Sequence, residues 1–158
     1  MMDFKRIMFP VDFSEASEGA FPQVLTLARK YDATLYLFHV VRDLAKIGLF
    51  YVPGLEFSTL KLDMAAGADK KMEEFVQRQA GQFKDVRTSV DIVTIGDEAE
   101  EILKFAKEND IDLVVMPTHG RKGVAHAFLG SVTERVIRNS PIPVMVVNLF
   151  QAWPQPTP

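Results

Sequence analysis

The chain of 158 residues contains no cysteine, which excludes a disulfide framework and a thiolate metal site. Its three histidines do not fall into a metal-ligand spacing, so no metal site is predicted. No apolar run approaches the ~20 residues of a membrane-spanning helix, and the first residues, MMDFKR, lack the apolar core of a signal peptide. We therefore expect a cytoplasmic protein with no membrane partner.

The chain also lacks an excess of basic charge. Its formal net charge of −3 supplies no positive field for nucleic acid, so nucleic acid is not an expected partner. Neither a G-x-x-x-x-G-K-(S/T) loop nor a G-x-S-x-G elbow occurs, so neither a Walker-type ATPase nor a serine hydrolase is indicated. No catalytic residue is assigned, and slow hydrolysis of a bound nucleotide stays open.

What the chain does have is a regular alternation of strand-like and helix-like segments. Apolar runs predict strands at Ile7–Val11, Thr34–Val41, Val86–Ile95, Leu113–Met116 and Val144–Leu149. Apolar residues at helical spacing predict helices that contain Ala20–Tyr31, Met72–Phe83, Ile102–Ala106 and Val132–Asn139. Strands separated by helices need crossover connections, so the pattern predicts a doubly wound α/β domain whose mostly parallel sheet is covered by helices on both faces.

A single domain fits the length and composition. At 47% hydrophobic and 25% charged residues, a chain of this size buries roughly two-thirds of its unfolded surface in one core. We place this domain at residues 1–149 and expect residues 150–158, which are rich in proline, to form a mobile tail. The segment Arg42–Ser58 is more apolar than a solvated loop. We expect this segment to be covered in one of three ways: by packing against the helix that follows it, by lying over a ligand crevice, or by contact with a partner subunit.

The stretch Leu113–Ser131 carries a local signal for phosphate binding. A strand opens into a loop with Gly120, Gly123 and Gly130, which free the backbone to present N–H groups to an anion. The sequence Ser131, Val132, Thr133, Glu134 then forms an S-x-x-E capping box, which places the positive end of a helix at the loop. The alternative is a well-capped helix without a ligand.

A second candidate region follows the first predicted strand. In a doubly wound sheet, ligands lie beyond the carboxyl ends of the strands, where the strand order reverses. If the first and fourth strands are neighbours, Pro10–Ser14 and Pro117–Arg121 face each other there. Asp12 is then an acceptor for an amine or hydroxyl. Locally, Asp12 is also a candidate cap of the helix after Phe13, with Ser14 sharing that role.

Other polar residues have simpler interpretations. Asp97 with Glu100, after the turn at Gly96, is typical of a cap for the third helix. His39 lies in an apolar strand and is expected to be structural, whereas His119 is a candidate ligand contact. The neighbouring cations Arg121 and Lys122 are candidates for neutralising phosphate, or are solvated surface residues.

Three segments, FKRIMFPVDFSEAS, LYLFHVV and LVVMPTHGRKGVAHAFLGSVTERVIRNSPIPVMVV, strongly resemble the universal stress protein family. The resemblance covers nearly the whole chain. It implies a five-stranded parallel sheet in the order 3-2-1-4-5 and a homodimer joined through the last strand, Val144–Leu149. An apolar last strand would otherwise be an exposed edge, a hazard that pairing removes.

The ATP-binding branch of that family carries a glycine, two residues, a second glycine, nine residues, and then a glycine followed by serine or threonine. Gly120, Gly130 and Ser131 match this motif, but Pro117 takes the place of the first glycine. Proline has no N–H, so one donor to phosphate is lost, at a cost of about 1.5–3 kcal/mol if that donor contacts a phosphate.

The resemblance implies a regulatory protein that binds ATP, with Mg²⁺ as a candidate companion ion. Asp12 and Val40 take the adenosine end, and Gly120, Gly130, Ser131 and Thr133 take the phosphates. The full set of implied nucleotide-binding residues is Pro10, Val11, Asp12, Val40, Met116, Pro117, His119, Gly120, Arg121, Gly130, Ser131, Val132 and Thr133. The alternative is a nucleotide-free dimeric stress or protein-interaction module whose phosphate loop is only structural.

Overall fold

The computed structural model describes residues 3–42, 57–118 and 129–148. Strands and helices alternate along the chain. They are β1 (Arg6–Pro10), α1 (Glu15–Lys30), β2 (Thr34–Arg42), α2 (Phe57–Gln79), the 3₁₀ turn η2 (Ala80–Gln82), β3 (Arg87–Gly96), α3 (Glu98–Glu108), β4 (Leu113–Pro117), α4 (Ser131–Asn139) and β5 (Val144–Val147). Among the described residues, no helix is long and apolar enough to cross a membrane.

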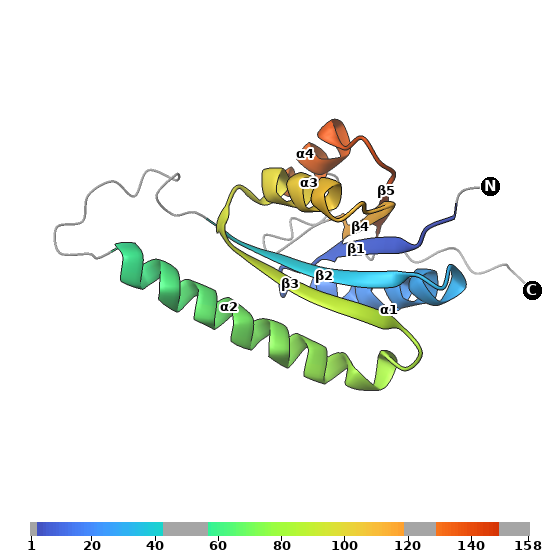
Figure 1. Cartoon of the computed structure of the whole chain (residues 1–158), viewed down its shortest axis with the longest axis horizontal. Coiled ribbons are helices and arrows are strands. Elements are labelled where there is room, and N and C mark those ends of the chain that lie inside the picture. Colours follow the sequence, from blue (N-terminus) through green and yellow to red (C-terminus); the bar gives the residue numbers. More distant parts are fainter. Residues whose placement is uncertain (1–2, 43–56, 119–128, 149–158) are drawn as a thin grey trace, which may run out of the picture.

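The five strands form one parallel sheet in the order β3-β2-β1-β4-β5. Figure 1 shows α1 and α2 on one face of the sheet and α3 and α4 on the other. The doubly wound fold and the strand order implied by the resemblance are therefore confirmed. The order reverses at β1, which lies between β2 and β4.

The core has two halves, one on each face of the sheet. Alternate residues of a strand point to opposite faces. Ile7 and Phe9 accordingly pack against α1 and α2, while Met8, between them, packs against α3 and α4. All three side chains are fully buried. This alternation on the central strand holds both helical layers to the same sheet.

Some predicted element boundaries need correction. The helix expected through Phe83 ends at Gln79 and tightens into η2, where Gly81 is a weak helix former. β1 ends at Pro10 rather than Val11, and β3 begins at Arg87 rather than Val86. β5 ends at Val147. The predicted tail at 150–158, most of Arg42–Ser58, and Leu149 lie outside the described residues.

Of the predicted helix caps, the one at Asp97 is confirmed and the one at Ser131 is wrong. Asp97 caps α3 as expected, since its Oδ1 accepts a hydrogen bond from Glu100 N at 3.1 Å. Ser14, not Asp12, is the N-cap of α1, and its Oγ accepts from Ser17 N at 3.2 Å. The capping box at Ser131 does not form: Ser131 is already helical, and Gly130 takes the N-cap position with an extended backbone.

Phe21 offers a test of the core. Its buried ring contacts those of Phe9, Phe75 and Phe83 at centroid distances of 5.9, 5.2 and 5.2 Å. We expect Phe21→Ala to lower the free energy of unfolding by about 3–5 kcal/mol, because the cavity removes the contacts of α1 with β1 and α2. Chemical denaturation measures this. Leu62→Ala is the control, since Leu62 is 71% exposed and its loss should change stability by less than about 0.5 kcal/mol. Similar values for the two variants would contradict the proposed core.

Candidate functional site

The backbone pairing between the two central strands, β1 and β4, stops before their carboxyl ends. β1 stays paired with β2 up to Pro10 and Phe38. The β1–β4 ladder pairs Ile7 with Leu113 and Met8 with Val114, and among the described residues it goes no further. This break in the pairing lies at the point where the strand order reverses, which is where a doubly wound sheet places its ligand.

Two prolines explain why the ladder stops. Val11 N donates to Phe38 O at 2.7 Å, so the odd-numbered N–H groups of β1 point to β2 and the nitrogen of Pro10 points to β4. Thr118 N donates to Val147 O at 3.0 Å, so by the same alternation the nitrogen of Pro117 points to β1. Neither proline has a hydrogen to donate. Pro117 therefore leaves the β4–β5 ladder intact and removes an N–H from the crevice side.

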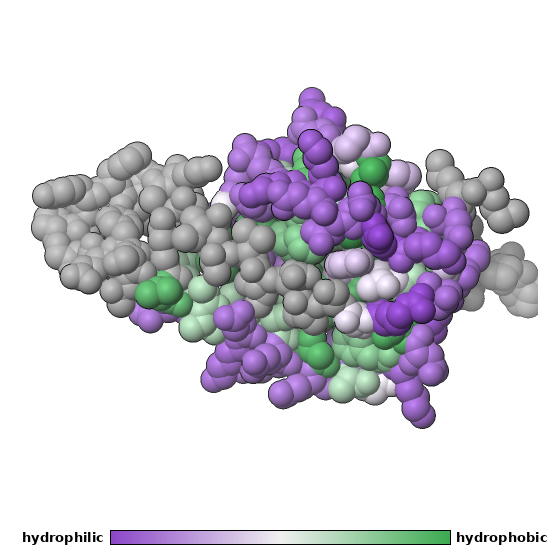
Figure 2. All heavy atoms as spheres, viewed as in Figure 1, coloured by the Kyte–Doolittle hydropathy of each residue, from purple (hydrophilic) through white to green (hydrophobic). Residues whose placement is uncertain are grey.

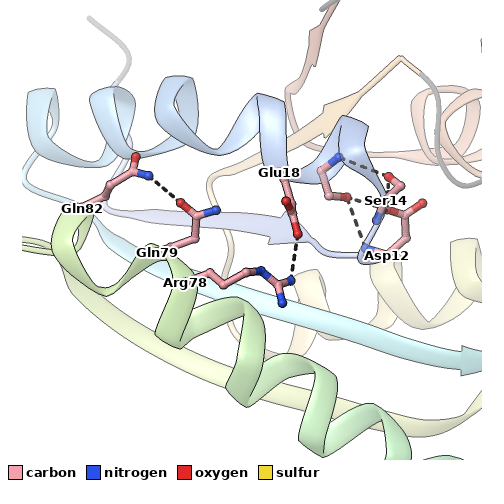
Figure 3. Close-up of polar contacts among 7 residues, drawn as sticks. Asp12, Ser14, Glu18, Arg78, Gln79 and Gln82 are labelled. Carbon is pink, nitrogen blue, oxygen red and sulfur yellow. Dashed lines mark hydrogen bonds and ion pairs between the residues drawn. The ribbon is translucent and has the colours of Figure 1, made fainter.

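Asp12 is held by hydrogen bonds from Ser14 and Ser17 on the turn after β1 (Figure 3). Its Oδ1 accepts from Ser14 N at 3.0 Å, Ser14 Oγ at 2.5 Å and Ser17 Oγ at 2.6 Å. Asp12 N in turn donates to Ser17 Oγ at 3.3 Å, and Ser17 is buried. The carboxylate is therefore fixed by the first turn of α1.

The same turn is anchored to β2 by a histidine. His39 is buried, and its Nδ1 lies 2.6 Å from Val11 O, an acceptor, which assigns the proton to Nδ1. The Phe13 ring packs on the His39 ring at 4.4 Å between centroids. Phe13 has φ +60°, a left-handed conformation that costs a residue with a side chain about 1–2 kcal/mol. The structural role expected for His39 is confirmed, and these contacts hold the turn in its strained form.

A cavity of about 360 Å³ lies between the turn at Asp12 and α2. It is lined by Asp12, Phe13, Lys71, Glu74 and Arg78. Arg78 donates to Glu18 Oε1 at 2.8 Å, which ties α2 to α1 beside the cavity (Figure 3). Sequence patterns do not single out these α2 residues, because exposed charges on an amphipathic helix are typical of any solvated surface.

The start of α4 is tied to the end of β4 by two hydrogen bonds. Gly130 N donates to Thr118 O at 2.8 Å, and the buried Thr133 donates through Oγ1 to Pro117 O at 3.1 Å. The N–H of Gly130 and the hydroxyl proton of Thr133 are therefore used internally. With φ −59° and ψ 141°, Gly130 also has a conformation open to any residue, so its backbone does not require glycine.

The backbone donors that face outward belong to the first turn of α4. The N–H groups of Ser131, Val132 and Thr133 precede the first intrahelical bond, from Glu134 N to Gly130 O. Within the described ranges, no side chain caps these groups. Together with the helix dipole they form a centre of positive potential at the carboxyl edge of β4.

The remaining predicted site residues differ in burial, and some lie outside the described residues. Val11, Val40, Met116 and Pro117 are buried, Pro10 and Val132 are half-buried, and Ser131 is exposed. Val40 and Met116 belong to the half of the core under α3 and α4. His119, Gly120 and Arg121 lie outside the described residues, as does Lys122.

An ion pair joins the starts of α3 and α4. Arg135 Nη1 lies 2.7 Å from Asp97 Oδ2. The next residue of α3, Glu98, pairs with Arg42 of β2 at 2.6 Å. The hydrogen bond from Arg135 lowers the pKa of the Asp97 carboxyl below its usual 3.8, and the same bond raises the pKa of Arg135. Figure 2 shows a largely hydrophilic surface over these two helices.

Comparison with known proteins gives consistent matches. A model of the Universal stress protein family matches residues 3–148. Universal stress protein MJ0577 of Methanocaldococcus jannaschii is 34% identical, over 92% of this chain and 95% of its own. Its structure superimposes with a TM-score of 0.78 at 29% identity, covering 96% of this chain and 100% of that one.

Two further structures share the fold. UspA from Lactobacillus plantarum gives a TM-score of 0.78 at 26% identity, over 93% of this chain and 99% of that chain. A universal stress protein from Archaeoglobus fulgidus, solved in complex with dAMP, gives 0.64 at 18% identity, over 92% of this chain and 98% of that chain. At that identity the second likeness concerns the fold alone.

The Asp97–Arg135 pair predicts a pH dependence of stability. Because the folded pKa of Asp97 lies below 3.8, the pair stabilises the fold above that pH and loses its effect as pH falls through the folded value. We expect the difference in unfolding free energy between the native chain and Asp97→Asn to be constant near neutral pH and to close in acid. Asparagine preserves the cap. Urea unfolding from about pH 7 to about pH 2 measures it, and Arg135→Gln should give the same profile. A difference that persists in acid would contradict the assignment.

Proposed function

The chain belongs to the universal stress protein family, and from that membership we propose that it is a regulatory module that binds an adenine nucleotide, ATP, in the crevice between β1 and β4. One observation carries this proposal: the pairing of the two strands stops at the reversal of strand order, and α4, whose start has no side-chain cap among the described residues, begins after β4 on the same side of the sheet as α3. A cleft flanked by a helix N-terminus is suited to phosphate.

The glycine at position 130 supports the same site. Its backbone conformation suits any residue, so the backbone does not explain why this position is glycine. In the proposed site, the absence of a side chain lets a ligand approach closely. In the proposed complex the N–H groups of Ser131, Val132 and Thr133 hold phosphate oxygens. Asp12 and Val40 take the adenosine end, while Pro10, Val11, Met116 and Pro117 form walls. The loop residues His119, Gly120 and Arg121 complete the site, and Mg²⁺ accompanies the phosphates.

A second function is favoured by the internal hydrogen bonds. The N–H of Gly130 and the hydroxyl of Thr133 already have acceptors in the chain, and Pro117 has no N–H. A site with so few donors left binds phosphate weakly. The alternative is therefore a nucleotide-free dimeric stress or protein-interaction module in which this region serves only to attach α4 to the sheet.

We also propose that the protein is a homodimer joined through β5 and its continuation to Leu149. β5 is an edge strand of the sheet, and its Met145 is 39% exposed. Ile137 on the neighbouring α4 is 42% exposed. A flat apolar edge of this kind is a site for pairing with another strand, and a second copy offers the same edge.

Titration calorimetry with ATP and Mg²⁺ tests nucleotide binding. We expect binding by the native chain and, because Pro117→Gly restores a crevice N–H, about tenfold tighter binding by that variant. Gly130→Val should abolish binding, since its side chain blocks the phosphate while the backbone conformation is kept. Binding only by Pro117→Gly favours the nucleotide-free function. Unchanged affinity in Gly130→Val would refute the placement.

Sedimentation at micromolar concentration tests the dimer. We expect a dimer for the native chain and a monomer for Met145→Asp, because a charge in the middle of an edge strand opposes strand pairing. Leu62→Asp is the matched control: it places the same charge at an exposed apolar position on α2 and should remain dimeric. A monomeric native chain, or two variants that behave alike, would contradict the β5 interface.

A further inference from the structure

Arg135 lies on the face of α4 that begins at Ser131. Residues four apart in a helix are neighbours on one face, and the rise between them is about 6 Å. Helical side chains lean toward the N-terminus, so the Arg135 side chain is directed toward the end of α4 that contains Ser131. A guanidinium there is within reach of an anion at the first turn of α4.

The present partner of Arg135 is a carboxylate on the neighbouring helix. Figure 1 shows α3 and α4 side by side on the same face of the sheet, and the 2.7 Å contact with Asp97 places the start of α3 beside the first turns of α4. That start is acidic, because Glu98, Glu100 and Glu101 follow Asp97. A phosphate at Ser131 therefore approaches this acidic helix start, where Arg42 pairs with Glu98 and Arg135 pairs with Asp97.

The ion pair is weak enough to exchange. The Arg135 side chain is 47% exposed and that of Asp97 is 27% exposed, and pairs in contact with water contribute little to stability. Asp97 also keeps a second partner, Glu100 N, when Arg135 leaves. A phosphate carries more charge than a carboxylate and accepts the planar guanidinium in two parallel hydrogen bonds.

We propose that Arg135 binds the phosphate chain of the nucleotide and that Asp97 competes for it, so that this pair sets the selectivity for phosphorylated over unphosphorylated ligands. This inference rests on the proposed nucleotide site. It adds a residue from the second turn of α4 to the first-turn donors. It also assigns to α3 a role in determining affinity.

Calorimetric titration with ATP and with adenosine, on the full chain, tests the proposal. Arg135→Gln should weaken ATP binding about tenfold and leave adenosine binding unchanged, because only ATP carries phosphate. Arg135→Lys should retain part of the ATP affinity, since it keeps the charge. Asp97→Asn should strengthen ATP binding severalfold and keep the α3 cap.

The matched control is Arg138→Gln. Arg138 lies on the same face of α4, about 10 Å from Ser131, and pairs with Glu134 of its own helix at 2.7 Å. Its loss removes the same charge from the same helix and should leave ATP affinity unchanged. Equal effects of the two arginine variants, equal losses for ATP and adenosine, or unchanged ATP affinity in Asp97→Asn would each overturn the proposal. A native chain that binds neither ligand overturns this inference and the nucleotide site together.

Discussion

The structure depends on the failure of two central strands to stay paired. β1 is hydrogen-bonded to β2 along its whole length, but its pairing with β4 ends after Met8 and Val114. The nitrogen of Pro10 is directed toward β4 and that of Pro117 toward β1, and a proline nitrogen has no hydrogen with which to continue a ladder. The site thus originates in the sequence of the strands themselves, before any loop or ligand is considered. This break in the pairing lies between the turn at Asp12, which follows β1, and the start of α4, which follows β4.

The two sides of the gap differ in how much of their polar surface is already engaged. On the β1 side, Ser14 and Ser17 fix the Asp12 carboxylate, and His39 fixes the turn from β2. On the β4 side, the carbonyl groups of Thr118 and Pro117 accept hydrogen bonds from Gly130 and Thr133, so these two donors are not available to a ligand. Side chains that are already rigid lose less entropy when a ligand binds, which favours binding. Donors that are already hydrogen-bonded within the protein contribute nothing to the affinity for a ligand. The balance between these effects separates a nucleotide-responsive protein from one that only presents surfaces to partners.

Sequence reasoning predicted the architecture well, because the alternation of apolar runs and helical spacing depends on local periodicity. Asp97 and His39 were also assigned correctly, each from its immediate neighbours. The capping box at Ser131 was wrong, because the hydrogen bond from Gly130 to Thr118 moves the helix start by one residue and no pattern reveals that bond. Lys71, Glu74 and the Arg135–Asp97 pair were missed for a related reason. Their neighbours come from other helices, and only the packed fold brings them together.

The proline at the end of β4 has a further consequence. An open seam between parallel strands would normally offer unused backbone donors to an extended segment of another polypeptide, as a sheet edge does. Pro117 presents a ring there instead of a hydrogen, and Pro10 does the same from the facing strand. The interrupted part of the ladder therefore offers a foreign strand no backbone donor from these two positions, which lowers the risk of aggregation there.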